Sequence, residues 1–415
     1  MTSRTDTAYN FLFDPCVMES TRLILPRGEY PGYDDPDEHI LSPDTNETLE
    51  RKRCRIRAMK GVVLSGGTGS RLRPITHTGP KQLVPVANKP VLQYAIEDLR
   101  DAGITDIGVV LGNKGRDEIQ DFLGDGSAFG VDITYIVQGN PLGLAHAAGC
   151  ARSFVGDDDF VMYLGDNLLK QGIEDLVESF REGAYDAGIS LQRVPNPKEF
   201  GIAYLDGDRN VERLVEKPDE PESDLALVGI YVFSNRVFDV IEELEPSWRG
   251  ELEITDAIQG LIDRGCAVDS HVVEGWWKDT GRPEDIIEAN RLILEDLSGE
   301  TEGTVETGAE VRGTVDLHES SRIESGAVVR GPVSIARETT VASGSYVGPY
   351  TSIGPSSTID GAHIENSVVV GASTISADVT IVDSLLGRGT AIESADGYLP
   401  EGKRLVVGEN SDLKL

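Results

Sequence analysis

Short runs of apolar residues alternate with amphipathic stretches between residues 60 and about 297. The stretch 91–102 places apolar side chains at helical spacing and is followed by Gly103, a common helix stop signal. The apolar runs themselves fit buried strands. Three clear examples lie at 107–111, 133–137 and 160–164. Strands that alternate with helices predict an α/β domain with a mostly parallel sheet covered on both faces.

Beyond residue 300 the apolar period becomes six. Branched apolar residues recur at every sixth position from Val305 to Ile359, with small or polar residues and glycines between them. This pattern predicts a parallel β-helix, in which each aliphatic side chain points inward and stacks on its equivalent in the next turn. A conventional antiparallel domain would show a period of two. The register breaks after Ile359 and resumes at Val369, so we expect a loop of altered length near 360–368.

Residues 1–58 are polar and turn-rich and lack any sustained period of 2 or 3.6. They predict a poorly structured N-terminal extension, and a regulatory or partner-binding arm is the functional alternative. Met59 directly precedes the first apolar strand, so the natural polypeptide could begin there. The predicted organisation is then the extension, an α/β domain at 59–300, a β-helix at 301–398 and a C-terminal tail at 399–415.

Charge narrows the range of partners. The chain has 71 Asp and Glu against 38 Lys and Arg, a formal net charge of −33. Such a field repels phosphate backbones and anionic lipid surfaces, so we expect no nucleic-acid partner. No run approaches the roughly 18 apolar residues of a membrane helix, so we expect no membrane partner. An acidic surface suits a cytoplasm of very high salt, where screening removes self-repulsion, and this predicts a halophilic protein rather than an ordinary acidic one.

The cysteines favour a reducing compartment. Cys16, Cys54, Cys150 and Cys266 are far apart, with no C-x-x-C pair. This spacing suggests neither a zinc site nor a disulfide framework. The N-terminus shows no basic region followed by an apolar core and a cleavage site, so we read no secretory signal. These features predict a cytoplasmic protein.

A glycine-rich turn follows the first apolar strand. Residues 65–74 read Ser-Gly-Gly-Thr-Gly-Ser-Arg-Leu-Arg-Pro. Glycines let the backbone approach a ligand closely, and successive N–H groups at a turn can bind an anion. The turn lacks the Gly-Lys-Ser/Thr ending of a Walker A loop and the third glycine of the dinucleotide-binding fingerprint. Alone, it is weak evidence for a phosphate site.

A second motif sharpens this interpretation. Residues 80–86 read Pro-Lys-Gln-Leu-Val-Pro-Val. Gly-Gly-x-Gly-x-Arg-Leu-x-Pro followed at this interval by Pro-Lys-Gln-Leu-x-Pro-Val resembles the sugar nucleotidyltransferases, most closely the glucose-1-phosphate thymidylyltransferases. The resemblance covers residues 59 to about 297. Further motifs follow in the family's order, at 138–145, 164–167, 200–201, 215–218, 249–256 and 277–281.

This resemblance implies a Rossmann-like, doubly wound mixed sheet followed by a left-handed parallel β-helix of hexapeptide repeats, as in the family's long form. It implies Mg²⁺-dependent transfer of a nucleotidyl group from dTTP to glucose 1-phosphate, giving dTDP-glucose and pyrophosphate, by a homo-oligomer. The catalytic residues would be Arg71, Lys81 and Lys217. The nucleotide-binding residues would be Leu64, Gly66, Gly67, Arg71, Lys81, Gln82, Gln138, Gly143 and Asp166. The sugar-phosphate site would comprise Asn167, Gly201, Glu216, Lys217 and Val228, and the metal ligands would be Asp166 and Asp279.

The chemistry agrees with these assignments. Displacement at a phosphorus atom by a phosphate oxygen brings two anions together, so a site must supply cations and positioning. Arg71, Lys81 and Lys217 provide them within an acidic chain. The carboxylates of Asp166 and Asp279 suit Mg²⁺, which commonly takes one or two carboxylates plus phosphate oxygens and water. Taken alone, the two aspartates could equally be a strand-end turn and a helix cap.

Some positions depart from the family pattern. Phe200 stands where the family often has Tyr, and Leu142 stands where short-form relatives often have Asp. His146 is interpreted as a core or helix-surface residue, because an ionised sugar phosphate needs no base. Trp276 and Trp277 are interpreted as packing residues rather than base-stacking platforms.

Three alternatives remain open. One is a UTP-dependent glucose- or glucosamine-1-phosphate uridylyltransferase, although the Lys81-Gln82 pair favours thymidylyl transfer. Another is a bifunctional enzyme whose β-helix carries an acyltransferase, for which only His318 and His363 are available as bases. The third is a non-catalytic regulator that binds nucleotide sugars, which a lost metal ligand or phosphate-binding residue would favour.

Overall fold

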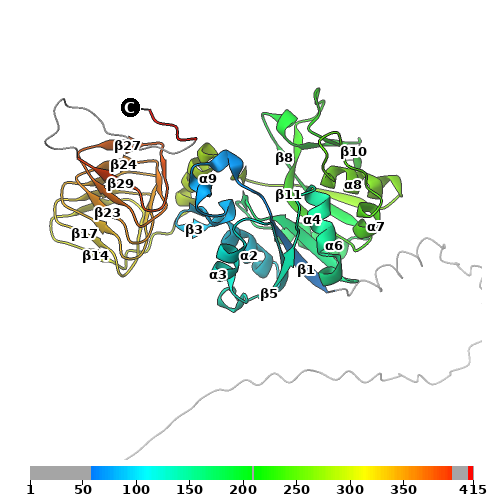
Figure 1. Ribbon diagram of the computed structural model, residues 1–415, viewed down its shortest axis with the longest axis horizontal. Coiled ribbons are helices and arrows are strands. Elements are labelled where there is room, and N and C mark those ends of the chain that lie inside the picture. The colour runs from blue at the N-terminus through cyan, green and yellow to red at the C-terminus, as the bar shows by residue number, and fades with distance from the viewer. Residues whose placement is uncertain (1–57, 208–209, 395–409, 415) are drawn as a thin grey trace, which may run out of the picture. The chain divides into compact units, whose positions relative to one another are not determined.

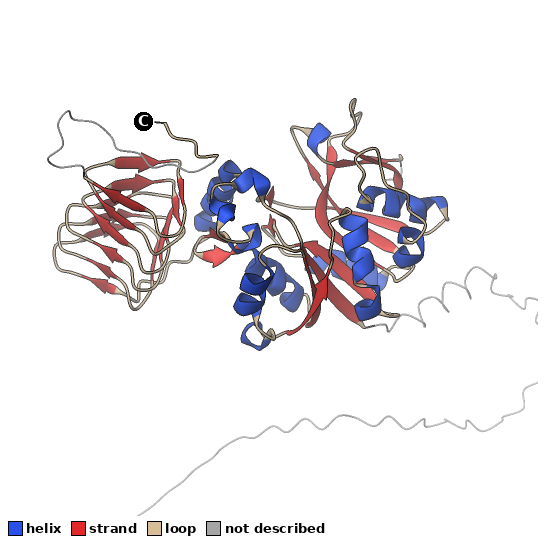
Figure 2. Ribbon diagram, viewed as in Figure 1, coloured by secondary structure: helices blue, strands red, loops and turns tan. Residues whose placement is uncertain are grey.

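The computed structural model describes residues 58–207, 210–394 and 410–414. The predicted extension lies outside them except for Ala58, and so does most of the predicted C-terminal tail. Figure 2 shows alternating helices and strands in one region and short strands alone in another. Among the described residues, no helix is long and apolar enough to cross a membrane. Cys150 and Cys266 are free thiols, and the other two cysteines fall outside the described part.

A mixed sheet organises the first region. Its strands are β1 (Met59–Ser65), β4 (Asp106–Leu111), β5 (Asp132–Val137), β6 (Asp159–Leu164), β8 (Ala187–Arg193), β9 (Gly201–Leu205), β10 (Val211–Glu216), β11 (Leu225–Phe233) and β12 (Val268–Val272). The order is β10-β9-β11-β6-β1-β4-β5, and β8 pairs with both β11 and β12. β1 runs parallel to β4 and β6, whereas β11 is antiparallel to β6 and β8. All three predicted strands form, but β5 is an edge strand whose residues are exposed or half-buried rather than buried. The sheet is Rossmann-like, and it is mixed rather than mostly parallel because β11 runs antiparallel to its partners β6, β8 and β9.

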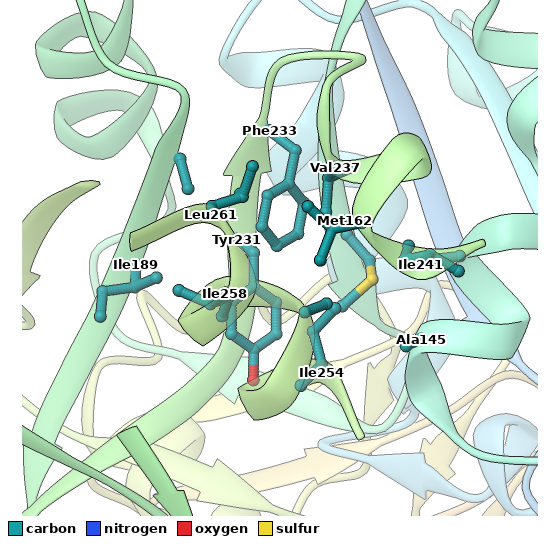
Figure 3. Close-up of a cluster of buried hydrophobic side chains, with 14 of the residues drawn as sticks. Ala145, Met162, Ile189, Tyr231, Phe233, Val237, Ile241, Ile254, Ile258 and Leu261 are labelled. Carbon is teal, nitrogen blue, oxygen red and sulfur yellow. The ribbon is translucent and has the colours of Figure 1, made fainter. Parts of the chain in front are cut away.

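Helices cover both faces of this sheet. They are α2 (Val91–Asp101), α3 (Arg116–Leu123), α4 (Leu144–Cys150), α5 (Arg152–Val155), α6 (Glu174–Glu182), α7 (Val237–Ile241) and α8 (Ile254–Asp263). One more helix, α9 (Pro283–Glu295), packs in a separate buried cluster instead. Alternate strand residues face opposite sides, so Val62 packs in the core with α4, α7 and α8, and Val63 packs with α2, α3 and α6. Figure 3 shows the first of these cores, where Tyr231 and Phe233 of β11 meet Ile258 and Leu261 of α8.

Small elements connect these layers. Short 3-10 helices lie at Ser70–Leu72, Ile75–His77, Lys81–Leu83, Ser127–Phe129 and Pro197–Glu199. A hairpin pairs β2 (Pro85–Val86) with β3 (Lys89–Pro90). A separate two-stranded sheet pairs β7 (Asn167–Leu169) with β13 (Trp277–Asp279) in antiparallel fashion. This second pair joins the motifs at 164–167 and 277–281, which are far apart in the sequence.

The C-terminal region is a left-handed parallel β-helix with three sheets (Figure 1). The first contains β14 (Thr304–Val305), β17 (Arg322–Ile323), β20 (Thr340–Val341), β23 (Thr358–Asp360), β26 (Thr374–Ser376) and β29 (Ala391–Glu393). The second contains β15 (Glu310–Arg312), β18 (Val328–Arg330), β21 (Tyr346–Val347), β24 (His363–Glu365) and β27 (Thr380–Val382). The third contains β16 (Val315–Leu317), β19 (Val333–Ile335), β22 (Thr351–Ile353), β25 (Val368–Val369) and β28 (Leu385–Leu386).

The six-residue pattern marks the inside of this coil. From Leu317 to Ile359 every residue of the pattern is buried, whereas Val305 on the first strand is 40% exposed. The expected loop at 360–368 does not leave the coil. Ile364 of β24 points inward instead, because the corners on either side of it are each one residue shorter than the regular repeat. The register therefore breaks in the sequence but not in the core.

Candidate active site

The glycine-rich turn lies at the carboxyl end of β1 and is crowded on two sides. A Cβ atom at Gly66 would lie 2.6 Å from Oε1 of Gln138, and one at Gly67 would lie 3.3 Å from Cε of Lys81. Only glycine leaves Gln138 room to approach at this distance. The turn thus brings residues from two predicted nucleotide-binding motifs together, beside a central strand end where open α/β sheets bind ligands.

The β7–β13 pair brings the two predicted metal ligands to the same place. Asp279 is the cross-strand partner of Asn167, the residue after Asp166. Thr280 secures the junction, since its backbone N–H and its hydroxyl donate to the Asp166 carbonyl oxygen at 3.0 and 2.7 Å. Asn167 in turn donates to the Asp166 carboxylate at 3.0 Å. Two carboxylates from distant motifs therefore converge.

Each carboxylate has a cation beside it. Lys81 Nζ forms an ion pair with Asp166 Oδ2, and Arg71 Nη2 lies 4.0 Å from Asp279 Oδ2. Burial lowers the pKa of Lys81, and Arg71 lowers it further, whereas the negative charge of Asp279 opposes both effects. An anionic ligand would offset the burial and the repulsion between these cations, so the arrangement favours phosphate binding.

Several buried polar atoms of the site have no protein partner within the described residues. They are Ser65 Oγ, Gln82 Oε1, Thr255 Oγ1 and Asp279 Oδ1. A buried polar atom without a hydrogen bond is costly, and such atoms are uncommon in native proteins unless a ligand, ion or water satisfies them. Gln82 is 1% exposed, so its amide can serve a ligand only from within the site.

A cavity of about 140 Å³ lies next to the paired carboxylates. Asp166, Asn167, Gly201, Glu216 and Asp279 line it, all of them predicted site residues. Its other walls come from Leu144, Leu164, Glu199, Phe200, Leu227, Gly229, Tyr231, Ile254, Thr255 and Trp277.

Phe200 and Trp277 form an aromatic wall of this cavity. Their ring centroids are 5.4 Å apart in an edge-to-face arrangement. The Trp277 indole N–H donates to Asn167 Oδ1 at 2.5 Å. Trp277 therefore packs, as expected, and it also lines the cavity and orients a site residue.

Arg249 is a site residue that sequence reasoning did not assign. It donates to Glu216 at 3.3 Å, to Glu253 at 3.1 Å and to Glu251 at 3.2 Å. Burial and the nearby Glu253 raise the pKa of Glu216, and Lys217 and Arg249 act against this. The signal available in the sequence was the motif at 249–256, whose first residue is this arginine.

The remaining predicted residues lie at different depths. Gly143 adopts φ +111°, and a Cβ there would lie 2.4 Å from the Leu252 carbonyl oxygen, so glycine is required. Leu64 is 7% exposed at the end of β1. Val228 is fully buried in the core between the cavity-lining Leu227 and Gly229, which leaves only its main-chain groups for a sugar.

Within the described residues, His146, His318 and His363 are not arranged as catalytic bases. His146 Nδ1 lies 3.3 Å from the Gln138 amide nitrogen. His318 contacts Ser320, and His363 packs edge-on against Tyr346 with ring centroids 5.7 Å apart. Both β-helix histidines are exposed, and their recorded side-chain contacts lie within the β-helix.

The two aspartates suit a magnesium ion. Asp279 Oδ1 is buried without a partner in the described residues, and Asp166 lies beside it through the β7–β13 pair. Within the same residues, no group of three or more His, Cys, Asp or Glu side chains could hold a metal. Magnesium often takes only one or two protein carboxylates, with water and substrate phosphate oxygens completing its coordination. The donor set therefore fits a metal that binds together with its substrate.

Known proteins are similar in sequence to most of this chain. Residues 60–296 match the family model described as nucleotidyl transferase. The chain is 71% identical over 357 residues to the low-salt glycan biosynthesis nucleotidyltransferase Agl11 of Haloferax volcanii, covering 86% of this chain and 100% of the relative. It is 48% identical over 358 residues to the glucose-1-phosphate thymidylyltransferase of Streptomyces antibioticus, covering 86% of this chain and 99% of that protein.

A solved structure agrees with the first region. It is a protein of Bacillus anthracis provisionally described as a glucose-1-phosphate thymidylyltransferase in complex with a sucrose. The two share 42% identity with a TM-score of 0.54, over 57% of this chain and 95% of that one.

Proposed function

Because this chain belongs to the nucleotidyl transferase family, we propose that it is a glucose-1-phosphate thymidylyltransferase, which converts dTTP and glucose 1-phosphate into dTDP-glucose and pyrophosphate. The observation that carries this proposal is the pairing of Lys81 with Asp166 and of Arg71 with Asp279 around the glycine-rich turn. The name of the 48% identical relative from Streptomyces supports the choice of dTTP and glucose 1-phosphate.

The reaction is a single displacement. A phosphate oxygen of glucose 1-phosphate attacks the α-phosphorus of dTTP and forms a new P–O bond. The bond from the α-phosphorus to the oxygen that bridges to the β-phosphate breaks, and its electron pair leaves with pyrophosphate. The nucleophile is already ionised, so the site needs no general base. This agrees with the described residues, among which no histidine of the site is positioned to act as one.

The side chains divide the work by position. Arg71, Lys81 and the glycine-rich turn hold the triphosphate and neutralise the charge that grows on the leaving pyrophosphate. Lys217 and Arg249 hold the sugar phosphate in line for attack. Gln82 and Gln138 bind the pyrimidine base. A magnesium ion held by Asp166 and Asp279 would polarise the phosphoryl oxygens and share the developing charge.

Pyrophosphate release measured with each nucleotide and each sugar phosphate tests the proposal. We expect the highest kcat/KM for dTTP with glucose 1-phosphate. Thymine and uracil differ by one methyl group, which can supply only about 1–3 kcal/mol of discrimination, so UTP should be a slower substrate rather than an inert one. A preference for UTP, or for glucosamine 1-phosphate, would replace the thymidylyl assignment. Tight binding of nucleotide sugars without turnover would instead support the alternative that the protein is a non-catalytic regulator.

A further inference from the structure

One buried amide joins the α/β region to the β-helix. Asn290 of α9 is fully buried. Its Oδ1 accepts hydrogen bonds from the backbone N–H of Ala87 at 2.9 Å and from the hydroxyl of Ser352 at 2.6 Å. Its Nδ2 donates to the Tyr350 carbonyl oxygen at 2.9 Å. Ala87 belongs to the β2–β3 hairpin, whereas Tyr350 and Ser352 belong to the β-helix. The Asn290 side chain therefore connects α9, the hairpin and the β-helix.

The turn of the hairpin makes a second contact with the β-helix. Asn88 Nδ2 donates to the Ser334 hydroxyl at 2.9 Å and to the Ser334 carbonyl at 3.1 Å. Ala87 and Asn88 have φ values of 47° and 63°. A left-handed conformation is unfavourable for alanine, so the turn needs support from its surroundings. Asn290 and Ser334 provide this support through hydrogen bonds.

Apolar contacts hold the same junction together. Val84, Val86 and Val91 pack with Ile286 of α9 and with Val368 of the β-helix in one buried cluster. Val368 lies in the same sheet of the coil as Ser334 and Ser352. The face formed by β19, β22 and β25 is therefore the one on which the hairpin rests.

The hairpin continues directly from the nucleotide-binding segment. Lys81 and Gln82 lie in the 3-10 helix that ends at Leu83, two residues before β2. Val91 N–H donates to the Val84 carbonyl at 3.2 Å, which closes the hairpin at its base. Gln82 is buried and Lys81 is paired with Asp166, so neither can shift without breaking its packing or its ion pair. A displacement of the turn would thus move the residues that hold the triphosphate and the base.

We propose that the β-helix positions the nucleotide-binding segment Lys81–Leu83 through the β2–β3 hairpin, with Asn290 as the positioning residue. This inference rests on the proposed function, because it assigns Lys81 and Gln82 to the nucleotide. It gives the β-helix a part in substrate binding that requires no residue of the coil to touch substrate. The sugar-phosphate residues lie on β7, β9, β10 and β11 and in the loops after β10 and before α8. None of them shares a hydrogen bond with Asn290 or Asn88, so the effect should fall mainly on the nucleotide.

Two mild substitutions remove hydrogen bonds that the β-helix makes, one with α9 and the other with the hairpin. Ser352→Ala removes the hydroxyl that donates to Asn290, and Asn88→Gly removes the side chain that donates to Ser334 while keeping a residue suited to positive φ. Ser345→Ala is the matched control, because Ser345 is 1% exposed and its hydroxyl is bonded only within the β-helix, to Ile359 and Gly361. Each full-length protein is titrated with dTTP, UTP and glucose 1-phosphate by calorimetry, and its melting temperature is recorded.

We expect Ser352→Ala and Asn88→Gly each to raise the Kd for dTTP about five- to tenfold, because nucleotide binding must then order a segment that the lost hydrogen bond held in place. The Kd for glucose 1-phosphate should stay within about twofold of wild type. The control, Ser345→Ala, should have a lower melting temperature without a selective rise in the Kd for dTTP. Equal weakening of both ligands, or a lower melting temperature with unchanged nucleotide binding, would show that these bonds only stabilise the fold and would overturn the inference.

The outcome also separates this inference from the proposed function. If the wild type binds UTP and not dTTP, only the thymidylyl assignment fails, because the same comparison is then made with UTP. If the wild type turns over dTTP and glucose 1-phosphate but the variants match the control, the function stands and the positioning role is wrong. A wild type that binds neither nucleotide contradicts both.

Discussion

Asp279 of β13 lies directly across from Asn167 of β7 in an antiparallel pair. The next residue, Thr280, donates its hydroxyl to the Asp166 carbonyl, and the carboxylates of Asp166 and Asp279 both line the cavity and act on Lys81. The proposed metal site thus depends on a two-stranded sheet outside the main one. A substitution in β7 or β13 should therefore weaken metal binding more than it lowers the stability of the fold.

Asp166→Asn and Asp279→Asn should each reduce kcat by about two orders of magnitude or more, because an amide lacks the charge that Mg²⁺ and the developing transition state need. Each variant should need a higher Mg²⁺ concentration than wild type for half-maximal pyrophosphate release, because one ligand of the metal has lost its charge. Asp239→Asn, an exposed carboxylate paired with Arg152, is the control and should keep its turnover. Full wild-type activity in excess chelator would contradict the metal assignment, and global unfolding of the variants would mean that these aspartates are structural.

The sequence predicted the β-helix better than the sheet. The period of six marks inward residues such as Ile335 and Ile353 without reference to the rest of the chain, because each turn contacts only its neighbours. The antiparallel half of the main sheet was predicted only through the family resemblance. Strand β11 pairs with β6, β8 and β9, and such distant pairings follow from tertiary packing rather than from local periodicity.

In the candidate active site, too, some residues were predictable from the sequence and others were not. Lys81, Asp166 and Asp279 were predicted because each lies in a recognisable motif, and the structure brings them together. Arg249 was not assigned, since its role depends on three glutamates converging on it from two segments. The contacts of Asn290 had no sequence signal at all, because they join elements that meet only in the folded chain.

Asp98 should make stability depend on pH. Burial raises its pKa to about 7, and Glu174, Asp101 and Glu97 add to this, while the hydrogen bond from Tyr163 opposes it. The folded pKa exceeds the usual value of 3.8, so the folded state binds more protons between these two values. The stabilisation is fully present below about pH 4 and is lost as the pH rises through about 7. We expect the free energy of unfolding to fall by about 2–3 kcal/mol from pH 5 to pH 8 through this group.

Asp98→Asn tests this assignment in urea unfolding curves at both pH values. The amide oxygen still accepts from the Tyr163 hydroxyl but carries no charge, so the variant should lose this part of the pH dependence and be more stable than wild type at pH 8. Asp239→Asn, an exposed carboxylate that pairs with Arg152 and is not among the groups that shift Asp98, should keep the wild-type slope. The same slope in both variants would mean that another group is responsible.

Ile353→Ala should destabilise the β-helix. Ile353 is fully buried, and its strand pairs with those of Ile335 and Val369 in the adjacent turns, so truncation leaves a cavity that the stacked coil closes poorly. A loss of about 2–5 kcal/mol is expected for such a change. Thr358→Ala, on an exposed outward position, should cost less than about 0.5 kcal/mol. Thermal melts of the two variants followed by circular dichroism make the comparison, and similar melting temperatures would contradict the stacking argument.

The two site lysines should act on different substrates. Lys81 is mostly buried and paired with Asp166 beside the glycine-rich turn, whereas Lys217 is 36% exposed and lies 3.9 Å from Glu216 at the cavity wall. Glutamine keeps much of the side-chain volume and removes the charge. Lys217→Gln should therefore weaken glucose 1-phosphate about tenfold or more while changing the Kd for dTTP little, as expected for the loss of a charge-assisted hydrogen bond.

Lys81→Gln should instead lower kcat most, because negative charge on the departing pyrophosphate grows in the transition state and an interaction made there appears in kcat. Calorimetry of both variants with both ligands, together with steady-state rates, decides the matter. Equal losses for dTTP and glucose 1-phosphate in the two proteins would mean that the lysines only set the general potential of the cleft. A selective loss in each would place the triphosphate at the turn after β1, where Lys81 lies, and the sugar phosphate at the end of β10, where Lys217 follows Glu216.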